Sequence, residues 1–248
     1  MAYYDFLDIL FAPLFKLPVL WAITLLSLII SLIIIFVTKY TTDQALMKKM
    51  KEDIKEYQKQ TKELKSEPAK AMEVQKKAMA VNMKYMTHSL KPTLITFIPI
   101  ILIFGWMSSN FAYESIKPNQ EFSVSAFFDK SSSGNAELIT PEGVTLLGNN
   151  TQKIEGDKSA WYLKGTEGEH LLEIDYNGEK QQKTVLITND NKYIEQIKKF
   201  SGKIKTIQID YKPKKILNLF GWKVGWLGTY IISSIIFTMA LRKLLKVY

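Results

Sequence analysis

Long apolar runs alternate with charged segments along this chain, and the alternation predicts membrane spans. Three uncharged apolar runs cover residues 18–38, 92–111 and 224–241. Each is close to the roughly 20 residues that an α-helix needs to cross the hydrocarbon core of a bilayer. We therefore predict a polytopic α-helical membrane protein with transmembrane helices over residues 17–38, 92–111 and 216–241.

The segment between the first two spans, residues 39–91, has the pattern of a helical hairpin. Apolar residues recur there at helical spacing in two stripes separated by a break. The stripes are Leu46, Met50, Ile54, Tyr57, Thr61 and Leu64, then Met72, Met79, Met83, Met86 and Leu90. The break at Ser66-Glu67-Pro68 is typical of a helix start, with proline in the first turn. This pattern predicts an antiparallel coiled coil.

The methionines of the hairpin have two interpretations. Thioether side chains are flexible and polarizable, so they suit surfaces that accept many apolar partners. In that case they contact an emerging hydrophobic segment, and the candidate contact residues are Met50, Met72, Met79, Met83 and Met86. In the other interpretation they only fill the seam between the two helices.

The long segment of residues 112–215 predicts a small β-rich external domain. Alternating or β-branched runs predict strands at 122–128, 160–163, 171–176, 184–188 and 204–209, with an Asn177-Gly178 hairpin turn. About seven short strands around a buried tryptophan suit an immunoglobulin-like sandwich. An α+β fold is the alternative, because residues 191–200 have helical spacing.

Residues 1–16 predict a short helix that lies in the membrane interface. Apolar side chains recur at helical spacing, with Asp5 and Asp8 on another face. These side chains are Tyr3, Phe6, Leu7, Leu10, Phe11 and Leu14. The two aspartates stand where a cleavable signal peptide has basic residues, so we do not expect one.

Charge orients the predicted spans. Residues 39–91 hold thirteen lysines against seven acidic residues, whereas residues 112–215 balance fifteen against fifteen. The tail, residues 242–248, adds Arg242, Lys243 and Lys246. Because lysine and arginine mark cytoplasmic flanks, we predict a cell-membrane protein with a cytoplasmic hairpin and C-terminus and an outside N-terminus. This explains the net charge of +9 without DNA binding.

Catalytic chemistry is not expected. The two histidines, His88 and His170, fall on opposite sides of the membrane in this topology, and the predicted spans hold no Asp, Glu or His. The chain has no cysteine, which excludes disulfides and thiolate metal sites. We predict that the protein is not an enzyme and that it uses no metal or cofactor.

Hydroxyl and small side chains recur along the predicted spans. The candidate groove residues are Thr24, Ser27, Ser31, Thr93, Thr96, Thr229, Ser233, Ser234 and Thr238. Close helix packing with weak interhelical hydrogen bonds is one explanation. The other is a partly hydrated groove that lowers the cost of moving polar segments through the bilayer.

The plan of the chain resembles the YidC/Oxa/Alb insertase superfamily. Local matches include Leu17-Pro18 before the first span, Thr42-Asp43-Gln44 after it, and Lys91-Pro92-Thr93 at the second. Phe220-Gly221-Trp222 and Gly225-Trp226 before the third span complete them. The resemblance covers about 150 residues and is closest to archaeal YidC-like proteins, which are related to the third subunit of the endoplasmic-reticulum membrane complex.

The resemblance implies a protein-transport chaperone that inserts membrane proteins. Short polar tails would cross the membrane while hydrophobic segments pass into lipid. The implied partners are the membrane, nascent hydrophobic polypeptides, the ribosome through its rRNA, and the Sec translocon, with no small-molecule substrate. Two departures matter: no arginine lies mid-membrane, unlike in bacterial members, and the external domain is larger than in minimal archaeal members. The alternative function is a membrane scaffold or adhesion protein that uses its external β domain and a docking hairpin.

Overall fold

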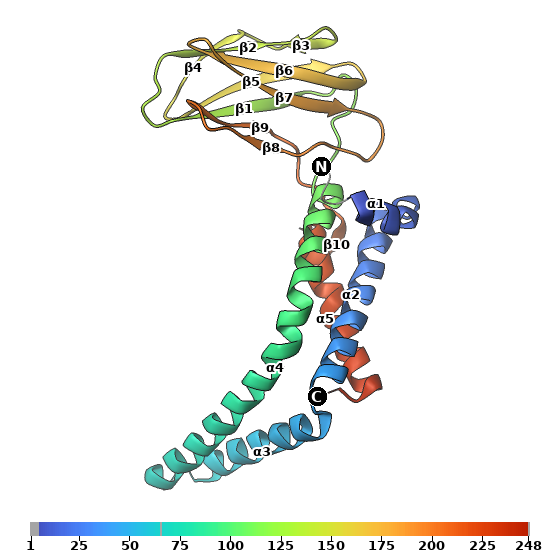
Figure 1. Ribbon diagram of the computed structural model, residues 1–248, viewed down its shortest axis with the longest axis vertical. Coiled ribbons are helices and arrows are strands. Elements are labelled where there is room, and N and C mark those ends of the chain that lie inside the picture. Colours follow the sequence, from blue (N-terminus) through green and yellow to red (C-terminus); the bar gives the residue numbers. More distant parts are fainter. Residues whose placement is uncertain (1–4, 65, 248) are drawn as a thin grey trace. The chain divides into compact units, whose positions relative to one another are not determined.

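The computed structural model describes residues 5–64 and 66–247, which form two compact units (Figure 1). The helical unit holds the chain up to residue 106 together with residues from 216 onward, and the β unit holds residues 107–215. Tyr3, which we assigned to the N-terminal helix, lies outside the described residues.

The helical unit contains five α-helices among its described residues. They are α1 (Asp5–Phe11), α2 (Val19–Thr41), α3 (Gln44–Glu63), α4 (Pro68–Phe111, whose last residues belong to the β unit) and α5 (Trp226–Leu245). A 3₁₀ helix, η1 (Ala12–Lys16), follows α1, and a β-hairpin, β10 (Leu217–Leu219) and β11 (Trp222–Val224), precedes α5. Three helices, α2, α4 and α5, are long and apolar enough to cross a membrane. The expected number of candidate spans is thus found.

Two helix boundaries differ from those we predicted. The hairpin arm and the second span are one continuous helix, α4, with Pro92 and Pro99 inside it. We predicted two separate segments there, because the uncharged apolar run that predicts the span begins at Pro92, after the lysine-rich hairpin. The third helix begins at Trp226 rather than at residue 216. Phe220 and Gly221 have positive φ (51° and 94°), so the chain turns back between β10 and β11 there.

Aromatic contacts join α4 to the other helices of this unit. The Trp106 side chain is fully buried, and its indole N–H donates to the Asp8 carboxylate at 2.6 Å. The Phe11 ring lies 4.9 Å from the Trp106 ring, between centroids. On α5, the Tyr230 ring meets Phe104 edge-on at 4.7 Å. Asp8 is therefore a packing partner of α4 rather than part of a free polar face.

The α3 arm and the first half of α4 each have one sheltered face. On α3 these buried or half-buried residues are Met47, Met50, Ile54, Tyr57, Thr61 and Leu64, and on α4 they are Ala71, Val74, Ala78, Val81, Tyr85 and Ser89. Met47 shares a cavity with Tyr85 and Ser89, so the faces adjoin at that end. Leu46 is exposed and Met47 takes its place, one position later than predicted. The coiled coil itself stays a prediction.

The β unit is a sandwich of two antiparallel sheets. One has the order β3-β5-β1-β9-β8 and the other β4-β2-β6-β7. The bounds are β1 Phe122–Phe128, β2 Asn135–Ile139, β3 Val144–Leu146, β4 Thr151–Lys153, β5 Lys158–Gly165, β6 Gly168–Tyr176, β7 Glu179–Ile187, β8 Ile197–Lys199 and β9 Ile204–Ile209. Buried residues of both sheets form one core, which includes Trp161.

Sequence patterns located most of this sandwich. The predicted β6–β7 hairpin is present, and Asn177 and Gly178 both have positive φ, as a type I′ turn requires. The α+β alternative is wrong, because residues 191–200 form no helix and contain the edge strand β8. Tyr193 instead packs against Tyr113 and Tyr211, and Ile197 is exposed. The apolar residues there serve a loop and an edge strand.

Candidate functional site

The hairpin methionines of α4 form an exposed apolar face. Met72, Met79, Met83 and Met86 are 54–64% exposed, and none lies on the sheltered face of the arm. Lys76 interrupts this face between Met72 and Met79, and from Met79 onward the face continues into the span at 3.6 residues per turn. We call it the apolar stripe; it consists of Met72, Met79, Met83, Met86, Leu90, Leu94, Phe97 and Ile101, all exposed. It occupies about 80° of the helix circumference.

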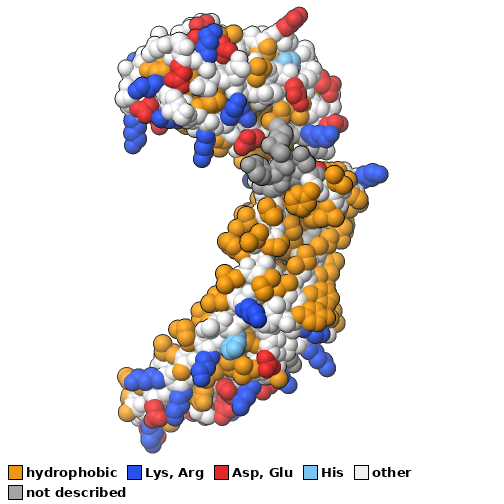
Figure 2. Space-filling view, viewed as in Figure 1, with side chains coloured by type: hydrophobic (Ala, Val, Ile, Leu, Met, Phe, Trp, Pro, Cys, Tyr) orange, Lys and Arg blue, Asp and Glu red, His pale blue; other side chains and the backbone are white. Residues whose placement is uncertain are grey.

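Other residue types occupy the remaining faces of the same arm. Lys77, Lys84 and His88 are exposed about 140° from the stripe centre, and the sheltered face lies about 140° the other way. The stripe is therefore distinct from the hairpin seam. Figure 2 shows basic side chains gathered toward the hairpin end of the helical unit and hydrophobic ones along its length. Met50, by contrast, is only 5% exposed and belongs to the sheltered face.

A small polar cavity lies among α2, α3, α4 and α5. Its volume is about 110 Å³, and its lining comprises Ile34, Thr38, Met47, Tyr85, Ser89, Pro92, Thr93, Thr96 and Arg242. The hydroxyls of Thr38, Thr93 and Thr96 each donate to a carbonyl of their own helix, at 2.7 to 3.0 Å. Their oxygens still have lone pairs that accept hydrogen bonds. The cavity thus joins four types of polar side chain near the ends of α2 and α5 and the middle of α4.

Arg242 is the cation of this cavity. It is the only arginine in the chain, beside 32 lysines. Its Nε–H is buried and has no hydrogen-bond partner among the described residues. Arg242 forms none of the ion pairs found in the part of the chain that the structure describes. Because Arg242 is half-buried and its Nε–H lacks a partner among the described residues, the cavity favours an anion or water beside the guanidinium.

The nine predicted groove residues do not come together in one place. Thr93 and Thr96 line the cavity, whereas Ser27 and Ser31 are buried along α2. The Thr238 hydroxyl of α5 donates to the Ser31 hydroxyl at 3.3 Å, which joins the two helices. The others are at least partly buried on α2 or α5, and most bond their own backbone: Thr24, Thr229, Ser233 and Ser234.

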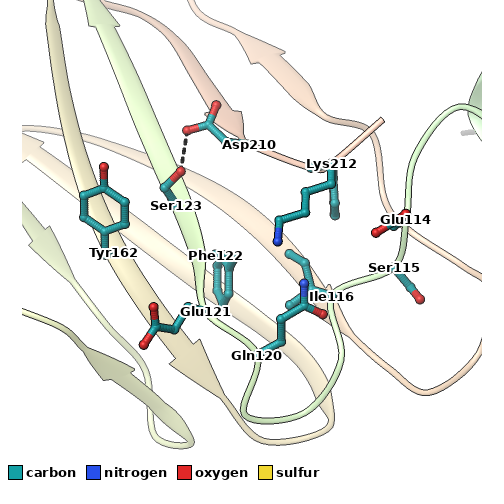
Figure 3. A pocket seen from close by; sticks show the side chains of 11 residues that line it. Glu114, Ser115, Ile116, Gln120, Glu121, Phe122, Ser123, Tyr162, Asp210 and Lys212 are labelled. Carbon is teal, nitrogen blue, oxygen red and sulfur yellow. Dashed lines mark hydrogen bonds between the residues drawn. The ribbon is translucent and has the colours of Figure 1, made fainter. Parts of the chain in front are cut away.

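The β unit has a cavity of its own, of about 280 Å³ (Figure 3). Three carboxylates and Lys212 line it. The Asp210 carboxylate accepts from the hydroxyls of Ser123 and Ser125, at 2.9 and 2.7 Å, and also from Gln208. Asp210 is therefore engaged in the fold of the sandwich. Within the described residues, no group of three His, Cys, Asp or Glu is placed to hold a metal.

These features define a multi-pass membrane protein with three candidate spans, a helical hairpin and a β-rich domain. Residues 7–127, just under half of the chain, match the family model described as Integral membrane protein EMC3/TMCO1-like. That family belongs to the YidC/Oxa/Alb insertase superfamily, so over this segment the match agrees with the resemblance noted in the sequence. The closer relation to archaeal YidC-like proteins stays a prediction. No curated protein and no solved structure has a significant match to the chain.

Sequence reasoning did not assign the cavity residues Arg242, Tyr85, Ser89 and Met47. Arg242 was interpreted only as part of a basic tail, although helix α5 extends to Leu245 and includes it. The sequence held one signal that could have pointed to Arg242: it is the one arginine of a chain that otherwise uses lysine, and it lies at the end of a predicted span.

Proposed function

We propose that this protein is a membrane protein insertase that works without covalent chemistry. It receives a hydrophobic segment at the hairpin and passes it along α4 into lipid, while a short polar tail crosses the membrane. Burial of about 20 apolar residues supplies the driving force, so no nucleotide is needed. The match of residues 7–127 to an insertase-related family supports this proposal.

The observation that carries the proposal is the apolar stripe. Leu94, Phe97 and Ile101 lie in the candidate span, where lipid would cover them, but Met72 to Leu90 precede it. A helix in water rarely leaves so many apolar side chains exposed on one face, and exposed apolar patches mark interaction surfaces. Four of its eight members are methionines, whose side chains adapt to apolar partners of different shape. Because the stripe runs along one unbroken helix, a client segment has the same apolar face beside it from the hairpin to the span.

The proposed orientation places the hairpin in the cytoplasm and the β unit outside. The lysine excess of residues 39–91 supports it, as do Arg242 and Lys243 in the last turn of α5. A cytoplasmic hairpin meets nascent chains and ribosomes, which makes ribosomal rRNA and the Sec translocon further proposed partners.

Crosslinking tests the role of the stripe. Ribosome-bound nascent chains carry a photoreactive residue in their apolar segment and are mixed with membranes that contain the protein. We expect Met79→Ser, Met83→Ser and Met86→Ser together to lower the crosslink yield severalfold, because three apolar contacts are lost from an exposed face.

The matched control carries Lys77→Ser, Lys84→Ser and His88→Ser, three exposed changes on another face of the same arm. It should retain the original yield. Equal yields from the wild type and the methionine variant would refute a client-binding stripe. Equal loss in both variants would indicate damage to the arm as a whole.

A further inference from the structure

The cavity around Arg242 carries an inference that is independent of the proposed insertase function. We propose that it binds the phosphate group of an anionic phospholipid. The lipid would then be a structural ligand of the helical unit, held where α2, α4 and α5 approach one another.

The chemistry of the lining fits a phosphate. The guanidinium is planar, always charged, and presents a fork of donors that matches two phosphate oxygens. Arg242 lines the cavity, and its Nε–H is buried with no partner among the described residues, so those residues leave at least one of its donors unsatisfied. Tyr85 carries a further hydroxyl donor on the same space. The hydroxyls of Ser89, Thr93 and Thr96 now donate to carbonyls of α4 and would turn from these carbonyls to donate to a bound phosphate.

The size of the cavity also fits. Its volume of about 110 Å³ compares with a share of about 30 Å³ per water in the liquid. It therefore holds a few waters or one tetrahedral oxyanion, but not a whole phospholipid headgroup with its chains. A lipid would insert its phosphate and leave its acyl chains against the exposed apolar surface of the helices.

The position of Arg242 favours a lipid as the source of the phosphate. It lies 16 residues after Trp226, the first residue of α5, or about 24 Å along the helix at 1.5 Å per residue. The hydrocarbon core of a bilayer is about 30 Å thick, so Arg242 falls near the level of the headgroups. The cavity contains no carboxylate that would neutralise Arg242 or repel a phosphate.

A thermal-shift titration tests the proposal. The full chain, purified in a neutral detergent, is titrated with short-chain phosphatidylglycerol, with inorganic phosphate, and with a soluble glutamate-rich peptide. Ligand that binds only the folded state raises the melting temperature in proportion to its occupancy. We expect phosphatidylglycerol to stabilise the wild type and the other two probes to have little effect at equal phosphate or carboxylate concentration.

The variants assign the effect to the cavity. Arg242→Gln should weaken the apparent lipid affinity by about tenfold or more, since it removes both the positive charge and the paired N–H donors of the guanidinium. Arg242→Lys, which keeps the charge and is the safer variant if Arg242→Gln folds poorly, should give a smaller loss. Lys243→Gln is the matched control. It removes one charge from the next residue, which is exposed and does not line the cavity, and should leave affinity unchanged.

Several results would overturn the proposal. Equal lipid affinity of Arg242→Gln, Arg242→Lys and the wild type would exclude the cavity as the site, and equal loss in Lys243→Gln would indicate a general charge effect. Stabilisation by inorganic phosphate but not by the lipid would refute the lipid source. Stabilisation by the acidic peptide alone would assign Arg242 to a polypeptide instead. None of these results bears on whether the protein inserts clients, which a separate insertion assay measures.

Discussion

At the scale of single residues, the structure shows where polar groups are satisfied inside each unit. Trp106 donates to Asp8, and Thr238 donates to Ser31 across two helices. Hydrogen bonds of the second kind contribute about 0.6 kcal/mol each between membrane helices. Pairings of this kind join residues that are far apart in the sequence, so periodicity alone did not predict them.

Asp129, at the end of β1, gives a residue-scale prediction of pH dependence. Its carboxylate accepts from the hydroxyl and the N–H of Ser131, at 2.7 and 3.1 Å, and the Lys205 ammonium lies 3.5 Å away. The Ser131 hydrogen bonds are the main cause that lowers the pKa of Asp129 from 3.8 to about 2. Because the folded-state pKa is the lower one, its stabilisation is complete above pH 3.8 and is lost as pH falls through 2.

We therefore expect Asp129→Ala to destabilise the β unit at pH 6, with a difference from the wild type that shrinks toward pH 2. Urea unfolding can be followed by the fluorine resonance of 5-fluorotryptophan at Trp161, the buried tryptophan of this core. The resonance is assigned with Trp161→Phe. A difference that stays constant from pH 6 to pH 2 would show that the carboxylate charge does not matter.

At the scale of elements, hydroxyl side chains serve two roles in different places. Ser27, Ser31 and Thr229 are buried where helices pack, whereas Thr38, Thr93 and Thr96 line the cavity beside Arg242. The two sets permit a direct comparison of packing with polar lining, since each has three hydroxyls.

Changing Ser27, Ser31 and Thr229 to Ala should lower thermal stability modestly and slow the insertion of all clients alike. Only the bond from Thr238 to Ser31 joins two helices, worth about 0.6 kcal/mol, because the Ser27 and Thr229 hydroxyls donate to their own helix. Changing Thr38, Thr93 and Thr96 to Val should slow the insertion of clients with charged tails more than that of clients with uncharged tails. The hydroxyls that line the cavity are expected to stabilise the polar tail of a client while it crosses the membrane. Insertion rates for matched pairs of clients provide the measurement. If both triple variants affect the two client types equally, the hydroxyls act only in packing.

Sequence patterns predicted elements better than they predicted the site. The strands 122–128 and 204–209 were located to the residue, because alternation and turn signals are local. The spacing of the methionines predicted that they share one face of the helix. It did not predict whether that face packs against α3 or is exposed, because this depends on how α4 is rotated about its axis. Ala71, Val74 and Ala78 fill the sheltered face instead. The cavity could not be predicted, because its lining comes from four separate helices.

At the scale of the whole molecule, the proposed insertase needs a defined orientation in the membrane. The chain has no cysteine, so single cysteines report position without interference. A cysteine at Lys62, which is exposed on α3, should react with an impermeant maleimide only after the membrane is opened. A cysteine at Asn177, at the exposed β6–β7 turn, should react in intact cells. Reaction of the Lys62 variant in intact cells would reverse the proposed topology.

Insertion into liposomes tests the proposed insertase activity itself. The purified protein is reconstituted into lipid vesicles, and a single-span client with a short polar tail is added as a ribosome-released chain. We measure the fraction of tails that become protected from an external protease. Insertion well above that of protein-free vesicles, reduced by the three methionine substitutions and retained in the Lys77, Lys84 and His88 control, is the predicted result. Protection no greater than in protein-free vesicles, with the protein folded and correctly oriented, would contradict the account.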